Sequence, residues 1–353
     1  MRGLRYLHNI LVPRANRHFA TINTVVTARA VQRYTQFRQF HYLACRMSQA
    51  PDGSQTPVPV QQFPHGHHPP FKQVEASRPD WEDLEWRMTK TVDPDWKPGS
   101  GANDNSGKNI KKVEIDPDAP DRSPRDNYKL MISAIAPRFI GFISTVSKDG
   151  RTTNLAPFSY TTMVNSDPPI MCVNIPVVGI ASGLENKKDT LQNILDTGEL
   201  VINVISEWFL EAANYTSIDA PHGTSEFALS GLTPLPSSKV KPPHVAESAF
   251  SIEAILVSHH PWFSPRTGKN TAVTIFAQGV NFHVREDMWV PGNEGSLVDI
   301  AKLKPVSRLG GIMYGRTTGG CEIPRAEFAV EKEKEEVRKI LDEGEIDYPT
   351  KWT

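Results

Sequence analysis

The order of apolar and polar residues between about 125 and 328 predicts a domain built mainly of β-strands. Short runs rich in β-branched and aromatic residues recur between turn-forming residues, which is typical of strands. The Asp149-Gly150 pair predicts a tight hairpin, and Pro157 marks a bulge or a sheet edge because it has no N–H to donate. We expect strands over 139–146, 154–164, 170–175, 200–205, 250–258 and 271–284.

A few helices are expected among these strands. One fits residues 190–196, where Gly198 would end it, and another fits about 206–214. Strands and helices do not alternate regularly, which favours a barrel over a parallel sheet. The chain has no G-x-G-x-x-G motif after a strand and no G-x-S-x-G motif, which argues against a dinucleotide-binding fold and an α/β-hydrolase.

The first 47 residues differ sharply in composition from the rest. The first fifty contain no Asp, Glu or Lys, and their eight charged residues are all arginines. A basic, acid-free, amphipathic N-terminus is typical of a mitochondrial targeting leader, so we expect a mitochondrial location. A disordered basic tail is an alternative, and initiation at Met47 would remove the leader and leave the protein in the cytosol.

Residues 48–124 read as a disordered, proline-rich linker, since they hold too little apolar surface to offset the entropy of ordering. Within it, Trp81, Trp86 and Trp96 indicate a strap over 80–100, with a short helix at 81–86 capped by Asp80. This strap would pack on the main domain or cover the partner subunit or a cofactor. Residues 329–353 are highly charged, and we expect a surface helix at 331–345.

Composition narrows the functional classes. With 39 Lys and Arg against 40 Asp and Glu, charge offers no case for nucleic acid as the main partner. The three cysteines form no C-x-x-C pair, so a disulfide scaffold or zinc site is not expected. The histidines at 65, 67 and 68 lie between prolines and predict a polar linker, not a metal site. No apolar run is long enough to span a membrane.

Several short segments, in order along the chain, resemble the flavin reductase-like domain family, the FMN-binding split barrels. The resemblance covers about 200 of the 353 residues. It implies a mainly β fold, a six-stranded antiparallel split barrel of Greek-key type, and a homodimer with flavin near the subunit interface. With its leader, the chain would be a eukaryotic member carrying an N-terminal extension. The segments are 137–145, Asn154-Leu155-Ala156-Pro157-Phe158-Ser159-Tyr160, Pro168-Pro169, Lys188-Asp189-Thr190, 225–232 and 307–314.

The resemblance also implies which residues hold the cofactor, FMN or alternatively FAD. Ala156 and Pro157 carry little bulk, so backbone could approach the flavin ring, and Ser159 could meet its polar edge. Lys188 and Thr190 lie where a helix begins, which favours a phosphate. Arg308 would reach the flavin or an acidic substrate group, or form a salt bridge at the dimer surface. The full expected set is Ser144, Thr145, Asn154, Leu155, Ala156, Pro157, Phe158, Ser159, Tyr160, Asn174, Ser182, Lys188, Thr190 and Arg308.

The implied reaction is hydride transfer from NADH or NADPH to the flavin, followed by passage of electrons to a monooxygenase or another acceptor. No catalytic residue is assigned, because the cofactor supplies the chemistry. One alternative is a non-catalytic flavin-binding or electron-carrier module resembling flavoredoxin. Another is an enzyme resembling pyridoxamine-phosphate oxidase, which the pattern from Asn154 to Ser159 disfavours.

Overall fold

The computed structural model describes residues 71–179, 185–186 and 188–344. Contacts divide the chain into two units, Met1–Asp80 and Trp81–Thr353. Within the first unit, the described part holds one helix, α2 (Phe71–Ala76). The expected leader, the linker before residue 71 and Ser182 lie outside the described residues.

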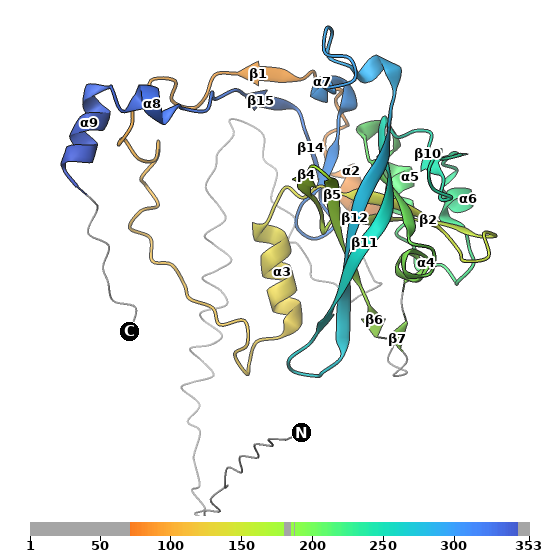
Figure 1. The fold of residues 1–353 in the computed structure, drawn as a ribbon. Coiled ribbons are helices and arrows are strands. Elements are labelled where there is room, and N and C mark those ends of the chain that lie inside the picture. The colour runs from red at the N-terminus through yellow and green to blue at the C-terminus, as the bar shows by residue number, and fades with distance from the viewer. Residues whose placement is uncertain (1–70, 180–184, 187, 345–353) are drawn as a thin grey trace, which may run out of the picture. The chain divides into compact units, whose positions relative to one another are not determined.

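The second unit is built on one antiparallel sheet, and it is mainly β, as the sequence predicts. Its strands lie in the order β3-β2-β8-β11-β12-β5-β4. The longest two, β11 and β12, run side by side as a curved hairpin (Figure 1). The bounds are β2 (Gly141–Val146), β3 (Thr153–Phe158), β4 (Thr161–Ser166), β5 (Pro169–Pro176), β8 (Glu199–Val204), β11 (Phe250–Phe263) and β12 (Asn270–Val284).

The sheet has seven strands because the strand expected at 154–164 breaks at Ser159 and Tyr160. The two pieces, β3 and β4, form the two edges of the sheet. The Thr161 hydroxyl closes the corner between them by donating to the Phe158 carbonyl at 2.7 Å. A side chain at Gly141 on β2 would meet this corner, since its Cβ would lie 2.7 Å from Thr161 Oγ1. The corner therefore packs directly on β2.

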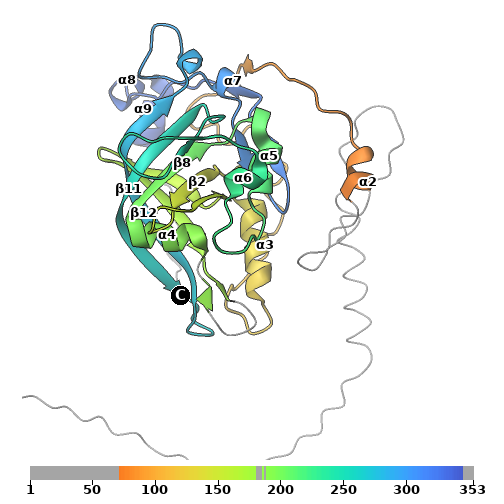
Figure 2. The same ribbon diagram turned by 90° about the vertical axis from the view of Figure 1, so that its right-hand side faces the viewer.

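Two apolar cores lie on opposite faces of β2. Side chains alternate along a strand, so Ile143 enters one core, with α4 (Asp189–Thr197), while Phe142 enters the other. The second core is covered by α5 (Leu210–Tyr215) and α6 (Glu226–Ser230), which lie beside each other in Figure 2. All six residues of β2 are buried as a result.

Both helices expected among the strands are present. The helix α4 ends at Gly198, which adopts a φ of 73° that suits glycine. A short 3₁₀ turn, η1 (Glu207–Phe209), precedes α5. The pattern of apolar residues did not predict α3 (Pro124–Ala134). The Ser123 hydroxyl caps its first turn by accepting from the Asp126 N–H. The short elements are β6 (Val178–Gly179), β7 (Glu185–Asn186), β9 (Pro234–Leu235), β10 (His244–Val245), η2 (Glu286–Met288), α7 (Ile300–Leu303), β13 (Val306–Arg308) and β14 (Tyr314–Arg316).

The tryptophan strap pairs with a segment from the C-terminal part of the chain. The helix expected at 81–86 is absent, and β1 (Arg87–Thr89) pairs instead in parallel with β15 (Gly319–Cys321), as Figure 1 shows. The Arg316 guanidinium lies 3.9 Å from the centre of the Trp81 ring and accounts for the extended backbone, since it also binds the Glu82 carbonyl. So short a helix is marginal alone, and these tertiary contacts decide the conformation.

The charged tail forms two exposed helices in place of the single one expected. These are α8 (Phe328–Glu331) and α9 (Glu335–Asp342), separated by residues 332–334. Across the described ranges, no helix is long and apolar enough to cross a membrane.

Candidate functional site

The corner between β3 and β4 offers hydrogen-bond donors without protein partners. Asn174 on β5 donates its N–H to the Tyr160 carbonyl at 2.9 Å, which holds the corner against β5. Within the described residues, no acceptor takes the backbone N–H of Ser159 or Tyr160, or the Ser159 hydroxyl. Backbone donors are almost always satisfied in folded proteins, so this corner suits a ligand with acceptor groups, or water.

The Tyr160 side chain borders this corner and is 42% exposed. Partial burial raises the pKa of its phenol, the neighbouring Tyr128 of α3 raises it further, and Arg138 lowers it. The phenol is therefore neutral at physiological pH and can donate or accept one hydrogen bond. The corner as a whole carries no charge on its own residues.

A buried polar network ties the first turn of α4 to the start of β3. The Thr190 hydroxyl donates to Asn154 Oδ1 at 2.6 Å, and Asn154 Nδ2 donates to Glu226 Oε2 at 2.9 Å. The Leu155 N–H reaches the same Glu226 oxygen at 3.0 Å. Asn154, Thr190 and Glu226 are all buried. Their side chains therefore satisfy one another and fix the position of the α4 N-terminus.

The charges near this N-terminus are partly compensated. Burial raises the pKa of the Glu226 carboxyl, although hydrogen bonds from Leu155 and Asn154 oppose the rise. Asp189 Oδ1 accepts a hydrogen bond from His222 Nδ1 at 2.7 Å, and that contact raises the pKa of His222. A protonated His222 offsets the negative charge that Asp189 would present to an anion.

The N-terminus of α4 is open to an anion. Lys188 is exposed and stands at the N-cap position, and no side chain caps the helix there. In the described part of the chain, no acceptor takes the N–H of Asp189 or Thr190. Free first-turn N–H groups, the helix dipole and an adjacent lysine together favour a phosphate.

Other expected site residues have internal partners. The Ser144 hydroxyl donates to the Pro243 carbonyl, and the Thr145 hydroxyl accepts from Asn193 Nδ2 at 3.0 Å. The side chains of Leu155 and Phe158 lie in the two cores, and Ala156 packs against one of them. Pro157 faces Phe142 in the register between β3 and β2. These residues shape the backbone around the site, and their side chains are mostly committed to the fold.

Arg308 is engaged with its own closing loop. Its guanidinium donates to the Gly311 carbonyl at 3.0 Å and stacks on Tyr314, 4.5 Å from the ring centre. The backbone of Arg308 pairs with Arg138, just before β2 begins. The structure places Arg308 near the start of β2, whose first residue, Gly141, pairs with Phe158 at the end of β3.

A pocket of about 410 Å³ opens on the outward-facing side of β11 and β12. The indole of Trp262 donates to Thr274 Oγ1 at 2.8 Å, and Thr274 donates to Asn174 Oδ1 at 2.9 Å. His260 meets Trp262 edge-on, with ring centres 4.5 Å apart. No sequence pattern indicated this pocket, whose lining is Ser258, His259, His260, Trp262, Thr274 and Phe276.

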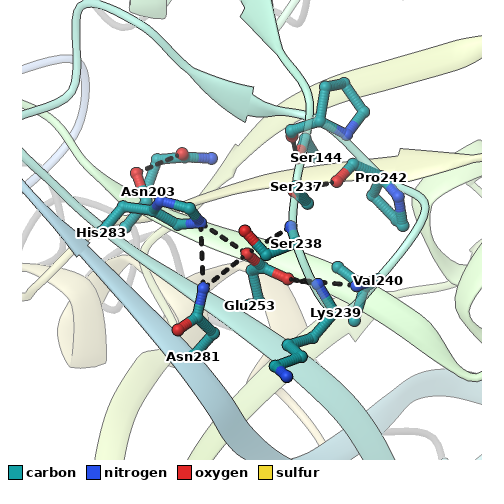
Figure 3. Close-up of polar contacts among 12 residues, drawn as sticks. Ser144, Asn203, Ser237, Ser238, Lys239, Val240, Pro242, Glu253, Asn281 and His283 are labelled. Carbon is teal, nitrogen blue, oxygen red and sulfur yellow. Dashed lines mark hydrogen bonds and ion pairs between the residues drawn. The ribbon is translucent and has the colours of Figure 1, made fainter.

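A second polar cluster surrounds Glu253 on β11. Its carboxylate is fully buried and accepts from three consecutive N–H groups, those of residues 238–240. Asn281 and His283 donate to it from β12, as Figure 3 shows. Burial would raise the pKa of Glu253, but these donors outweigh it and lower the pKa to about 2. In the described ranges, no group of His, Cys, Asp and Glu side chains could hold a metal ion.

The donor set fits an elongated ligand with an anionic group at one end and ring acceptors at the other. The open N-terminus of α4 adjoins Asn154 at the start of β3, and the free donors of Ser159 and Tyr160 follow its end. Ser159 follows Asn154 by five positions of extended chain, or about 17 Å at ~3.3 Å per position. A flavin mononucleotide carries these groups in this order, so the residues present fit it.

Comparison with known proteins identifies the family. The model of the flavin reductase like domain matches residues 134–293. An uncharacterized protein of Aquifex aeolicus is 34% identical over 197 residues, which are 56% of this chain and 92% of that protein. The chain belongs to the flavin reductase-like domain family.

Solved structures give the same fold. Nitrilotriacetate monooxygenase component B from Bacillus cereus is 29% identical, with a TM-score of 0.53 over 62% of this chain and 99% of that one. The 2-nitrobenzoate 2-nitroreductase NbaA of Pseudomonas fluorescens is 23% identical, with a TM-score of 0.51 over 61% of this chain and 98% of that one. At that identity the second comparison supports the fold alone.

Proposed function

We propose that this chain is an FMN-binding oxidoreductase of the flavin reductase type, which takes electrons from NADH or NADPH and passes them on. The observation that carries the proposal is the pairing of two open donor sets along β3. One is the N-terminus of α4 beside Lys188, and the other is the corner at Ser159 and Tyr160. Family membership agrees with a flavin as the ligand.

In this proposal each donor set has one task. Lys188 and the first-turn N–H groups of α4 hold the phosphate. The hydrogen bond from Thr190 to Asn154 fixes the position of that turn. The N–H groups of Ser159 and Tyr160 donate to acceptors on the pyrimidine edge of the ring. The bound flavin supplies two-electron chemistry with a pyridine nucleotide. FAD would need room beyond the phosphate site, which makes FMN the simpler ligand.

The same site would serve an electron carrier that holds flavin without turning over a pyridine nucleotide. Similarity to a monooxygenase component favours the enzyme over the carrier, since that protein's name describes it as one component of a monooxygenase. A separate monooxygenase component is therefore our proposed electron acceptor. An oxidase of the pyridoxamine-phosphate type is the weaker alternative, because family membership lies on the reductase side.

Titration of the purified full chain with FMN tests the site, with quenching of flavin fluorescence as the signal. Replacing Lys188 with Ala removes one charge-assisted phosphate contact, so we expect about tenfold or greater weakening of FMN binding. Lys148→Ala, in the exposed turn between β2 and β3, is the matched control and should bind like the wild type. Equal affinity in the Lys188 variant would remove the α4 N-terminus from the site.

We also propose a homodimer. Its support is the outward apolar surface of β4 and β11, where Met163 is 68% exposed and Phe263 60% exposed. Burying such residues against a second copy would be favourable at roughly 25 cal/mol per Å² of apolar surface. Light scattering on the purified chain should give twice the monomer mass, and Met163→Glu should lower it. A monomeric wild type would contradict the proposal.

The mitochondrial location stays a proposal that rests on residues 1–47. Their eight arginines and lack of acidic residues support it. N-terminal sequencing of protein from native mitochondria should find a start near residue 47. An intact Met1 in the native protein would contradict removal of the leader, and a cytosolic chain beginning at Met47 would favour the alternative start.

A further inference from the structure

Three side chains on neighbouring strands form a hydrogen-bond relay that ends beside the β3–β4 corner. Trp262 on β11 donates to Thr274 on β12 at 2.8 Å, and Thr274 bonds Asn174 on β5 at 2.9 Å. The register places Thr274 directly opposite Asn174. Asn174 also holds the Tyr160 carbonyl through its backbone. The relay thus connects the pocket on β11 and β12 with the corner.

The chemistry of the indole fixes the direction of the whole relay. An indole N–H only donates, so the Thr274 oxygen must accept from Trp262. Thr274 is buried, and its own proton then needs an acceptor, which Asn174 Oδ1 supplies. Turning the Asn174 amide around would set its NH₂ group against Thr274 and leave the hydroxyl proton without a partner.

The Asn174 amide is therefore held in one orientation. Its carbonyl oxygen faces Thr274, and its NH₂ group points away from it. Among the residues that the structure describes, no acceptor takes this NH₂ group. Asn174 is half-buried and adjoins the unpartnered donors of Ser159 and Tyr160. An oriented amide donor at such a position is suited to a carbonyl acceptor on a ligand.

We infer that Asn174 donates a hydrogen bond to a pyrimidine carbonyl oxygen of the flavin, and that Thr274 and Trp262 are positioning residues for this donor. The inference rests on the proposed flavin site; it specifies the contact made by Asn174, already in the expected set, and the two residues that orient it. Trp262 and Thr274 also line the pocket on β11 and β12, so the relay runs from that pocket to Asn174.

Three variants of the full chain separate the contact from a general effect on folding. Thr274→Val keeps the shape but removes both relay bonds, and Thr274→Ser restores the hydroxyl. Asn174→Asp keeps the acceptor for Thr274 and removes the NH₂ donor. The matched control is Asn270→Asp on β12. The Oδ1 atom of the Asn270 side chain accepts a hydrogen bond from the Ala272 N–H, and aspartate keeps that acceptor.

The readouts are the dissociation constant for FMN and the infrared carbonyl stretches of FMN labelled with ¹³C at its pyrimidine carbonyls. We expect about 3- to 10-fold weaker binding in Thr274→Val and about tenfold in Asn174→Asp. One carbonyl stretch should move to higher frequency in both variants, because it has lost a donor. Thr274→Ser and Asn270→Asp should match the wild type. A loss of packing alone would not move that stretch.

Nuclear magnetic resonance of the flavin-free chain supplies a readout that needs no cofactor. The Asn174 side-chain amide and Trp262 indole signals should shift together in Thr274→Val and return in Thr274→Ser. Unchanged carbonyl stretches and affinities in Thr274→Val and Asn174→Asp would overturn the inference while leaving the flavin site intact. A wild-type chain that takes up no FMN would instead overturn the proposed function, and the inference with it.

Discussion

Replacing Glu253 with glutamine tests how one buried carboxylate holds a loop on the sheet. Glu253 lies on β11, and its oxygens accept from the N–H groups of Ser238, Lys239 and Val240 (Figure 3). His283 donates to Oε1 at 2.5 Å. An amide at this position has only one acceptor oxygen, and its NH₂ group would face donors. Several buried N–H groups would therefore lose their partner in the Glu253→Gln variant.

The pKa of Glu253 sets the size of the expected loss in folding free energy. Although burial alone would raise it, the surrounding donors lower the pKa of Glu253 from 4.5 to about 2. At ~1.4 kcal/mol per pKa unit, this fall corresponds to about 3 kcal/mol of folding free energy at neutral pH. Since the folded pKa is depressed, the contribution is fully present above pH 4.5 and is lost as pH falls towards 2. Glu253→Gln should therefore cost about 3 kcal/mol at pH 7, and the difference should shrink below pH 4.5.

Urea unfolding followed by tryptophan fluorescence, at pH 7 and pH 3, measures both effects. The matched control is Glu247→Gln, because Glu247 accepts hydrogen bonds from Thr233 at an exposed position. That control should change stability by less than about 1 kcal/mol. A Glu253→Gln variant as stable as the control at pH 7 would refute the reasoning, as would a difference that stays constant with pH.

Three further predictions concern stability, measured by denaturant or thermal unfolding. Gly141→Ala would place a Cβ 2.7 Å from Thr161 Oγ1 and should lower the free energy of unfolding by about 1–3 kcal/mol. Unchanged stability would contradict this close packing. Thr190→Val should cost about 1–3 kcal/mol because the buried Asn154 carbonyl loses its donor, whereas Thr190→Ser should recover most of that cost, and equal losses would contradict the network. Burial lowers the pKa of His244, so its contribution to stability is present above pH 6.5 and is lost as pH falls below that value; a melting temperature equally acid-sensitive in His244→Phe would count against this.

Local patterns predicted most of the sheet. The Asp149-Gly150 hairpin and the helix ended by Gly198 both depend on neighbouring residues, and both are present. The break at Ser159 and Tyr160 was not predicted, because it arises where β4 packs on Gly141, a residue eighteen positions earlier in the chain. The helix expected at 81–86 was wrong for a similar reason, since distant Arg316 holds that backbone extended.

The candidate site was predicted by resemblance more than by chemistry. The segment 154–160 and Lys188-Asp189-Thr190 do meet, through the bond from Thr190 to Asn154. The sequence could not show that these two side chains bond to each other. Because they do, the donors left for a ligand are the backbone N–H groups at Ser159 and at the α4 N-terminus. Thr274, the side-chain partner of Asn174, lies a hundred residues further along the chain, so no local pattern could have revealed the relay.

Anaerobic addition of NADH or NADPH to the FMN-loaded full chain tests the central proposal most directly. The account predicts that FMN stays with the protein through gel filtration or binds on titration, and that its visible absorption bleaches on adding one of the two nucleotides. Bound flavin that neither nucleotide bleaches would favour an electron carrier over a reductase. A chain that takes up no FMN would contradict the account, leaving the family fold without the proposed activity.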